Sequence, residues 1–291
     1  MGASTFLLQL LNGVQFGVLL FLLASGLTLT FGIMNVINLA HGSFFMIGAY
    51  LTYEFATHMG LPLAVAMLGA IASVVVIGTI LEWFTLAPLV NRGHLDQVLL
   101  TYGLILIFDE LATIIWGKDV QPAEIPRIFR GSVNVFSLFD YPLYRLVIIA
   151  VGLLTAFGLY LLISRTRLGM IVRAGTVDRN MVRALGIPVN SIFSIVFGIG
   201  AALAALGGIV ASPVLSISPE MGDRIIIIAF VVVVIGGIGS IRGAFIGALL
   251  VGLVDTFGKV LFPSFSSLGI YLLMAAVLIW RPEGLFGAPA R

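Results

Sequence analysis

The 291-residue sequence has no cysteine and little charge: 15 Lys and Arg residues and 13 Asp and Glu residues make up 10% of the chain. The lack of cysteine excludes disulfides, thiolate metal sites and cysteine nucleophiles. An average soluble domain is roughly one-quarter charged. Because 60% of the residues are apolar, polar side chains could not cover the surface of a soluble protein of this length. The composition therefore predicts a membrane protein, much of whose surface is in contact with lipid.

Motifs that carry chemistry are also lacking. The three histidines, His41, His58 and His94, form no HExxH motif, which argues against a zinc hydrolase. Neither Gly-Lys pair, at 117–118 and 258–259, belongs to a phosphate-binding loop. A formal net charge of +2 without a polybasic run argues against nucleic-acid binding. We expect no catalytic residue, no metal site, no cofactor bound by this chain and no enzymatic activity.

Long apolar segments dominate what is present. Nine of them approach the length of about 20 residues that a helix needs to cross a bilayer. We expect an all-α polytopic membrane protein with about 8–9 transmembrane helices in one domain, residues 1–291. The seventh and ninth segments are short, which is typical of half-helices or re-entrant segments. The segments are residues 7–33, 40–57, 62–87, 97–116, 142–163, 190–211, 225–238, 244–262 and 268–280.

Basic residues indicate the orientation, because cytoplasmic loops carry the excess of Lys and Arg. If all nine segments cross, one set of connections contains nine arginines and the other contains four basic residues. The richer set includes the 164–189 segment and the C-terminus, so both are predicted to be cytoplasmic. Its members are Arg92, Arg165, Arg167, Arg173, Arg179, Arg183, Arg242, Arg281 and Arg291, against Lys118, Arg127, Arg130 and Arg224.

A polar stripe interrupts the apolar sequence early in the chain. Asn35, Asn38 and His41 follow one another at three-residue intervals, so neighbouring members would share a helix face, and Gly42 comes next. Two interpretations remain open. The polar groups could cap a helix break, or they could line the path of a translocated substrate.

Ionisable residues inside the spans are costly, so each is a functional candidate. Glu110 lies about seven residues, roughly 10 Å, from the outer end of its span. We include it in the candidate path as a group that could face an aqueous vestibule. Asp255 and Lys259 are four residues apart with the acid first, the favourable order for a helical ion pair. We expect them to neutralise each other, with a position on the path as the alternative.

Residues 165–188 predict a short amphipathic helix, ended by Gly186 and Pro188. An interfacial helix bound to anionic lipid and a docking helix for a cytoplasmic partner explain the pattern equally well. The apolar stripe would contain Met170, Ala174, Val177, Met181, Ala184 and Leu185, with Thr176, Arg179, Asn180 and Arg183 on the opposite face.

Four ordered motifs carry a family resemblance over nearly the whole chain. They are NVINLAHGSFFMIGAY at 35–50, the 165–188 segment, VIGGIGSIRGAFIG at 234–247 and RPEGLF at 281–286. Together they resemble the LivH-type permeases of bacterial branched-chain amino acid ABC importers. The resemblance implies a multi-pass subunit of the bacterial inner membrane, without its own ATPase site, that translocates branched-chain or other neutral amino acids.

The same resemblance implies partners. These are a LivM-type second permease, two cytoplasmic ATP-binding subunits that use ATP, a periplasmic substrate-binding protein, the small-molecule substrate and membrane lipid. The 164–189 segment would be the coupling segment, seated in an ATPase groove. It departs from the Glu-Ala-Ala loop of many ABC importers and keeps only the ending Ala184, Gly186, Ile187 and Pro188. The residues implied in coupling are Arg167, Gly169, Arg173, Asp178, Arg179, Arg183, Leu185 and Gly186.

Other functions remain as alternatives. Within the family, the substrate could be urea, an amide or an aromatic acid. In a different class, the chain could be a self-sufficient secondary transporter, a passive channel or a structural subunit. An importer subunit is expected to lack an ion-coupling site and to carry a cytoplasmic docking helix, and the sequence meets both expectations.

Overall fold

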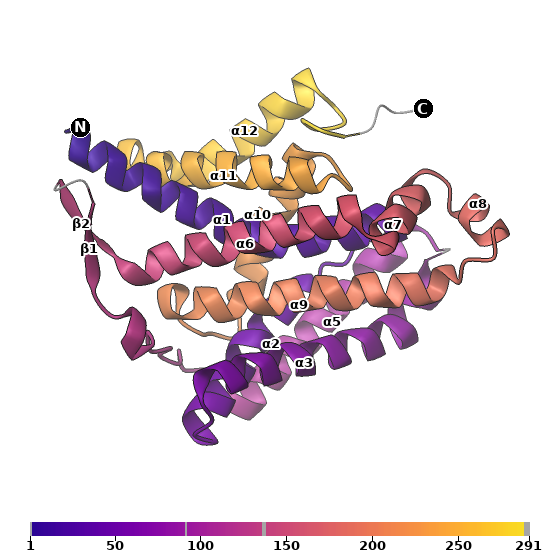
Figure 1. Cartoon of the computed structure of the whole chain (residues 1–291), viewed down its shortest axis with the longest axis horizontal. Coiled ribbons are helices and arrows are strands. Elements are labelled where there is room, and N and C mark those ends of the chain that lie inside the picture. The colour runs from indigo at the N-terminus through magenta and orange to yellow at the C-terminus, as the bar shows by residue number, and fades with distance from the viewer. Residues whose placement is uncertain (1, 91, 136–137, 288–291) are drawn as a thin grey trace.

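A computed structural model of the chain describes residues 2–90, 92–135 and 138–287, which are mostly helical (Figure 1). Among these residues, six helical stretches are long and apolar enough to cross a membrane. The chain is therefore a multi-pass membrane protein. The stretches are α1 (Ala3–Met34), residues Leu63–Leu89, α5 (His94–Trp116), α6 (Leu143–Arg165), α9 (Val189–Leu215) and α11 (Ile241–Leu261).

Shorter elements complete the bundle. All nine apolar segments expected from the sequence lie on helices, so the predicted helical class is confirmed. The stretch 63–89 contains α3 (Leu63–Leu81), the π-helix η2 (Glu82–Leu86) and α4 (Ala87–Leu89). The other elements are α2 (His41–Tyr53), the π-helix η1 (Glu54–His58), η3 (Arg127–Phe129), β1 (Ser132–Val135), β2 (Phe139–Pro142), α7 (Arg167–Val177), α8 (Arg179–Ala184), α10 (Met221–Gly236), η4 (Pro263–Phe265) and α12 (Ser266–Trp280).

Helix α1 forms the centre of the bundle and packs along α6, α9, α10 and α11. Glycine allows the closest of these approaches. A Cβ atom on Gly17 would lie 2.7 Å from the carbonyl oxygen of Ala248 in α11. The two helices therefore meet backbone to backbone, which is the packing that small residues permit in membrane helices.

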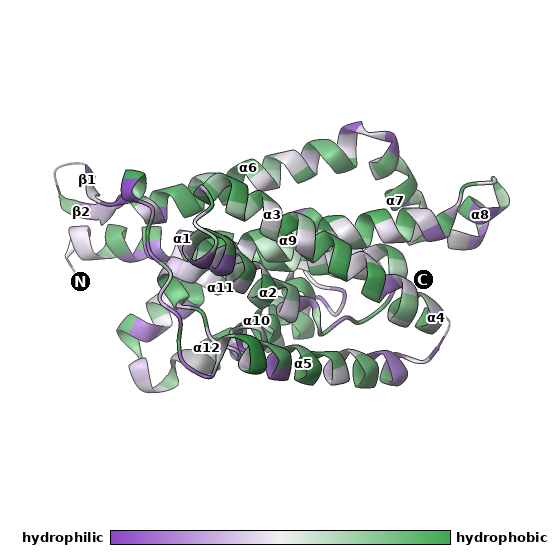
Figure 2. Ribbon diagram, turned by 90° about the horizontal axis from the view of Figure 1, so that it is seen from below, coloured by the Kyte–Doolittle hydropathy of each residue, from purple (hydrophilic) through white to green (hydrophobic). Residues whose placement is uncertain are grey.

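The connections gather at two opposite ends of the bundle. The Arg-rich end contains α7, α8 and the turn 237–240, because Gly32 near the end of α1 faces both Gly239 and Thr176. The hairpin end contains the antiparallel strands β1 and β2, and the connection after α5 pairs there with Ile217 through Gln121. Hydrophilic residues concentrate towards these ends, while the helices between them are mainly hydrophobic (Figure 2).

The segment 165–188 corrects one expectation. Instead of a single amphipathic helix, it forms two, α7 and α8, which are separated at Asp178. Asp178 has an extended backbone, and its Oδ1 accepts hydrogen bonds from the N–H groups of Asn180 at 2.8 Å and Met181 at 3.0 Å. An aspartate in this geometry starts a helix rather than continuing one. Gly186 follows the second helix with φ +80°, as the predicted helix end requires.

Two further contacts stabilise the ends of helices. Lys259 Nζ lies 2.5 Å from the buried Asp255 Oδ2, so the predicted ion pair is confirmed. The C-terminal motif returns to α10, where the N–H groups of Leu285 and Phe286 donate to the carbonyl oxygens of Ile235 at 2.8 Å and Gly236 at 3.0 Å. These bonds satisfy two carbonyl groups that the end of a helix leaves without partners.

Candidate functional site

Two short helices, α2 and α10, begin against each other inside the bundle. A Cβ atom on Gly42 would lie 2.5 Å from the carbonyl oxygen of Gly222, and a Cβ atom on Gly222 would lie 2.6 Å from that of Gly42. The N–H groups of Gly42, Ser43 and Met221 already donate to carbonyl groups of the preceding turns. The contact still brings together the positive ends of two helix dipoles, which favour an anionic group nearby.

The chain reaches this point through two turns that each contain a non-glycine residue with positive φ. α1 ends at Asn35 with φ 51°, and α9 ends at Ser216 with φ 61°, the two non-glycine residues with positive φ among those described. Each N–H bonds back to the preceding turn, at the carbonyl of Phe31 or Ser212. Asparagine tolerates this left-handed conformation better than most residues. Both long helices therefore end abruptly, and each is followed by a helix that starts within the protein.

Buried polar side chains without partners surround the start of α2. Asn38 and His41 are 2% and 0% exposed, and Ser43 is also buried. The side chains of Asn38 and Ser43 make no hydrogen bond with the described residues. The His41 ring faces the carbonyl of Leu23, but neither ring nitrogen makes a hydrogen bond of good geometry. Since buried polar groups are nearly always paired, these three are available to a ligand.

His41 lies deep in the bundle. A Cβ atom on Gly26 of α1 would be 2.7 Å from His41 Nε2, and a Cβ atom on Gly200 of α9 would be 3.5 Å from His41 Cε1. Gly200 is near the middle of α9, so the imidazole sits far from both ends of that helix. The glycines leave just enough room for the ring between α1 and α9.

A carboxyl cluster lies at the start of α10. Asp109 of α5 and Asp223 in the first turn of α10 lie near each other, and Glu220 adds negative charge nearby. Glu220 also pairs with Arg224 at 3.0 Å. The cluster can therefore attract a cationic group.

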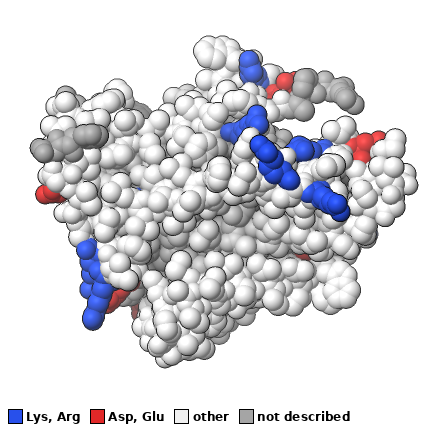
Figure 3. Space-filling model, viewed as in Figure 1, with Lys and Arg blue, Asp and Glu red and all other residues white. Residues whose placement is uncertain are grey.

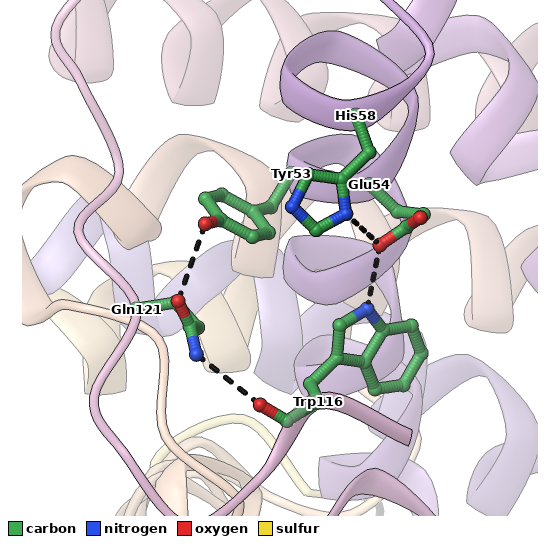
Figure 4. Close-up of polar contacts among 5 residues, drawn as sticks. All are labelled: Tyr53, Glu54, His58, Trp116 and Gln121. Carbon is green, nitrogen blue, oxygen red and sulfur yellow. Dashed lines mark hydrogen bonds and ion pairs between the residues drawn. The ribbon is translucent and has the colours of Figure 1, made fainter.

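A network at the hairpin end fixes the far end of α2 (Figure 4). Glu54 Oε2 accepts a hydrogen bond from Trp116 Nε1 at 3.0 Å and lies 2.9 Å from His58 Nδ1. The Tyr53 hydroxyl donates to Gln121 Oε1 at 3.2 Å, and Gln121 Nε2 donates to the carbonyl of Trp116 at 3.2 Å. The network ties η1 to the end of α5 and to the connection that follows it.

The segment 164–189 turns much of its apolar stripe outward. Val172 and Val182 are buried, and Gly169 packs against the carbonyls at the end of α6. In contrast, Leu185 is 72% exposed. All six members of the predicted stripe are exposed: Met170, Ala174, Val177, Met181, Ala184 and Leu185. Arg167, Arg173, Asp178, Arg183 and Gly186 are also exposed, and the side chain of Arg179 lies outside the described part.

The predicted path residues separate into two groups. Asn38, His41 and Gly42 come together at the start of α2, whereas Asn35 is exposed at the Arg-rich end and Glu110 is exposed on the outward face of α5. Sequence analysis did not place Asp109, Asp223, Ser43 or Gly222 on the path. Asp109 lies at nearly the same depth as Glu110 in the sequence, and only the packing reveals which of the two is more buried.

Comparisons with known proteins give one consistent match. A family model described as the permease component of a branched-chain amino acid transport system matches residues 9–279. The high-affinity branched-chain amino acid transport system permease protein BraD of Pseudomonas aeruginosa is 34% identical over 98% of this chain and 96% of its own length. The corresponding protein LivH of Escherichia coli is 30% identical over the same shares of the two chains. No solved structure matches significantly.

Proposed function

Since the chain belongs to the family of permease components of branched-chain amino acid transport systems, we propose that it passes branched-chain amino acids through the membrane as a subunit of an ATP-driven importer. The match of the family model to residues 9–279 carries this conclusion. Substrates such as urea, amides or aromatic acids are not favoured, because the relatives are named for branched-chain amino acids. A secondary transporter or a channel is not favoured by these names either.

The proposed orientation places the Arg-rich end in the cytoplasm. This follows the excess of Lys and Arg that cytoplasmic connections carry. The chain then forms a single permease domain of the bacterial inner membrane with about 8–9 crossings, of which α2, α10 and α12 are the short ones, and its C-terminus is cytoplasmic. The chain itself binds no cofactor, and ATP is used by two partner subunits.

The proposed translocation path passes the joined starts of α2 and α10. An amino acid carries a carboxylate and an ammonium group. The helix starts suit the carboxylate, and the carboxyl cluster suits the ammonium group. The helix starts with Asn38, His41 and Ser43 offer partial positive charge and hydrogen bonds to the carboxylate. The carboxyl cluster of Asp109 and Asp223 attracts the ammonium group. In the described structure the start of α2 is closely packed, so transport requires α2 and α10 to separate.

The outward face of α5 is the proposed contact with a second, LivM-type permease. The helix is mostly exposed, and it presents Glu110 on that face. A carboxylate inside a span is costly when it faces lipid. Coverage by a second permease removes this cost and places Glu110 in a vestibule between the two subunits. A periplasmic binding protein would deliver the substrate to the hairpin end.

Helices α7 and α8 are the proposed coupling segment. Their apolar side chains Met170, Val177, Met181 and Leu185 are exposed to the outside of the chain, and the basic side chains lie among them. An exposed apolar patch with a charged rim is typical of a protein interface. An ATP-binding subunit that covers this patch could move α7 and, through Gly169, the end of α6.

The experiment is transport by the complete complex. Proteoliposomes that contain this chain, the second permease, the ATP-binding subunits and the binding protein should accumulate leucine, isoleucine or valine only with ATP inside. Omission of this chain should abolish uptake. Uptake by this chain alone, driven by an ion gradient, would contradict the proposal.

A further inference from the structure

A cavity of about 510 Å³ lies at the Arg-rich end, between α1, α6, α7 and the start of α11. It is separate from the joined starts of α2 and α10. Its deep walls are buried, as at Phe21, Leu159 and Val172, whereas Arg173 and Arg242 are exposed. The cavity therefore has an apolar interior and a basic entrance.

The lining changes in a fixed order along α1. Gly32 lies beside α7 at the entrance, Thr28 lies roughly 6 Å deeper and Phe21 roughly 10 Å beyond that, at 1.5 Å per residue. Helix α6 shows the same order, from Ser164 near the entrance to Ala156 inside. From the entrance inward, the cavity therefore presents charged groups, then hydroxyl groups and then apolar groups. A phospholipid has its phosphate, ester groups and acyl chains in the same order.

The basic side chains at the entrance form no ion pair with an acid among residues 2–90, 92–135 and 138–287. Arg173 donates to the carbonyl of Ile163, and the Arg242 guanidinium lies 5.8 Å from the centre of the Tyr160 ring. None of the ion pairs found in the described residues includes either arginine. Basic side chains at this end are visible as a group in Figure 3. The guanidinium groups of Arg173 and Arg242 therefore stand at the edge of an apolar cavity without an ion pair among the described residues. This arrangement suits an anionic ligand with a hydrophobic tail.

Deeper in the cavity, the hydroxyl of Thr28 is an independent sign of a ligand. Thr28 is 0% exposed, and its oxygen makes no hydrogen bond with the described residues. In contrast, Thr30 on the same helix bonds to the carbonyls of Gly26 and Leu27. Helix threonines normally satisfy their hydroxyl in this way when nothing else is offered. Thr28 is part of the cavity lining, and its hydroxyl has no hydrogen-bond partner among the described residues.

We propose that the cavity binds an anionic phospholipid, with its phosphate on Arg173 and Arg242, an ester oxygen on Thr28 and the start of one acyl chain against Phe21 and Leu159. Basic pockets between membrane helices on the cytoplasmic side are suited to such headgroups. The inference rests on the proposed orientation, which puts this end at the inner leaflet, but not on which substrate is carried. The lipid would tie α7 to α11 across the cavity and so hold the coupling segment in place.

The test is lipid retention by the purified importer complex. The complex is incubated in detergent with equimolar phosphatidylglycerol and phosphatidylcholine, washed and analysed by native mass spectrometry. Wild type should retain phosphatidylglycerol roughly 25-fold better than phosphatidylcholine, since each of the two arginines near the lipid headgroup contributes a factor of about five. The double variant Arg173→Gln, Arg242→Gln should lose the preference, and Thr28→Val should weaken retention.

Matched control variants distinguish lipid binding in this cavity from a general effect of the positive charge of the chain. The double variant Lys118→Gln, Arg127→Gln removes two charges at the hairpin end, and Thr30→Val removes a hydroxyl that is already paired; both should retain lipid like wild type. Equal retention by the Arg173, Arg242 variant and wild type would overturn the proposal. So would complete displacement by inorganic phosphate, which would indicate a free-anion site, or cross-linking of Ile246 to a partner subunit, which would indicate a protein in the cavity. Because retention is measured without transport, a complex that fails to carry branched-chain amino acids leaves this result standing.

Discussion

Gly42 and Gly222 are in backbone contact, and neither position has room for a Cβ atom. The two residues belong to the first turns of α2 and α10, so the contact joins two helices that start inside the bundle. It also sets how close the partially positive ends of these helices come. The distance between the backbones of Gly42 and Gly222 therefore sets the geometry of the proposed path.

Replacement of Gly42 by alanine is expected to destabilise the chain. The new methyl group would meet the Gly222 carbonyl oxygen at 2.5 Å, and overpacking of this kind typically costs about 1–3 kcal/mol. Thermal unfolding of the purified complex should occur at a lower temperature. Gly103→Ala in α5 is the control, because no atom lies within 4 Å of the added methyl group. Equal stability of the two variants would show that α2 and α10 are not held by this contact.

Asn38→Leu and His41→Leu are expected to lower uptake while the complex still assembles. A hydrogen bond to a charged group contributes about 1.5–3 kcal/mol, so uptake per complex should fall roughly 10- to 100-fold. Thr155→Val is the control, since the Thr155 hydroxyl is already paired with the carbonyl of Val151. If complex yield collapses while uptake per complex is unchanged, these side chains cap the helix break and do not line the path.

The neighbouring acids of α5 should behave differently. Asp109→Asn removes the charge of the partly buried acid near Asp223 and should slow uptake strongly, because the ammonium group of the substrate loses its counter-charge. Glu110→Gln changes the exposed neighbour and should mainly weaken co-purification of the second permease. Uptake rates and subunit ratios from the same preparations separate the two effects. If Asp109→Asn and Glu110→Gln changed uptake and subunit ratios in the same way, the two acids would not have the separate roles proposed here.

The double variant Arg183→Ala, Leu185→Ala should insert normally but lose the ATP-binding subunits in a pull-down. Truncation of residues anchored in an interface often costs about 2 kcal/mol or more, whereas a lipid-facing arginine contributes about 1 kcal/mol. Arg127→Ala, Ile128→Ala removes the same kinds of side chain at the hairpin end, where Ile128 is 83% exposed, and should leave the subunits bound. Retention by both variants over a range of salt would indicate a helix on the lipid surface.

Two replacements of Asp178, one of them conservative, test the role of the α8 cap in the same segment. Asp178→Ala removes the cap of α8 and should cost about 1 kcal/mol of helix stability, which loosens α8 and lowers substrate-stimulated ATP hydrolysis. Asp178→Asn keeps an oxygen that accepts from the N–H groups of Asn180 and Met181 and should restore most of the activity. A loss of activity in both variants would show that the charge of Asp178 matters and not its cap.

Local sequence signals predicted much of this structure. Long apolar runs located the helices, and the spacing of Asp255 and Lys259 predicted their ion pair, because both depend on residues close together in the chain. The break at Asp178 was missed because the 3.6-residue pattern continues across it, although aspartate is a good helix cap. The hairpin of β1 and β2 was not anticipated, since each strand has only four residues.

The candidate site depends on contacts that sequence spacing cannot reveal. Asn38, His41 and Gly42 were recognised because they lie in one local stripe. Gly222 and Asp223 are about 180 residues further along the chain, and only the packing of α10 against α2 brings them to the same place. Asp109 and Glu110 are adjacent and similar in chemistry, so only the orientation of α5 reveals that Asp109 is the more buried of the two.

The return of the C-terminal motif to α10 has a consequence for biosynthesis. The carbonyl groups of Ile235 and Gly236 receive their hydrogen bonds from Leu285 and Phe286, which the ribosome adds about fifty residues later. Until residues 285 and 286 have been synthesised, these two carbonyl groups must therefore find their hydrogen bonds elsewhere. A nascent chain that stops at α12 would contain all six long apolar stretches and still lack the two bonds that close the end of α10.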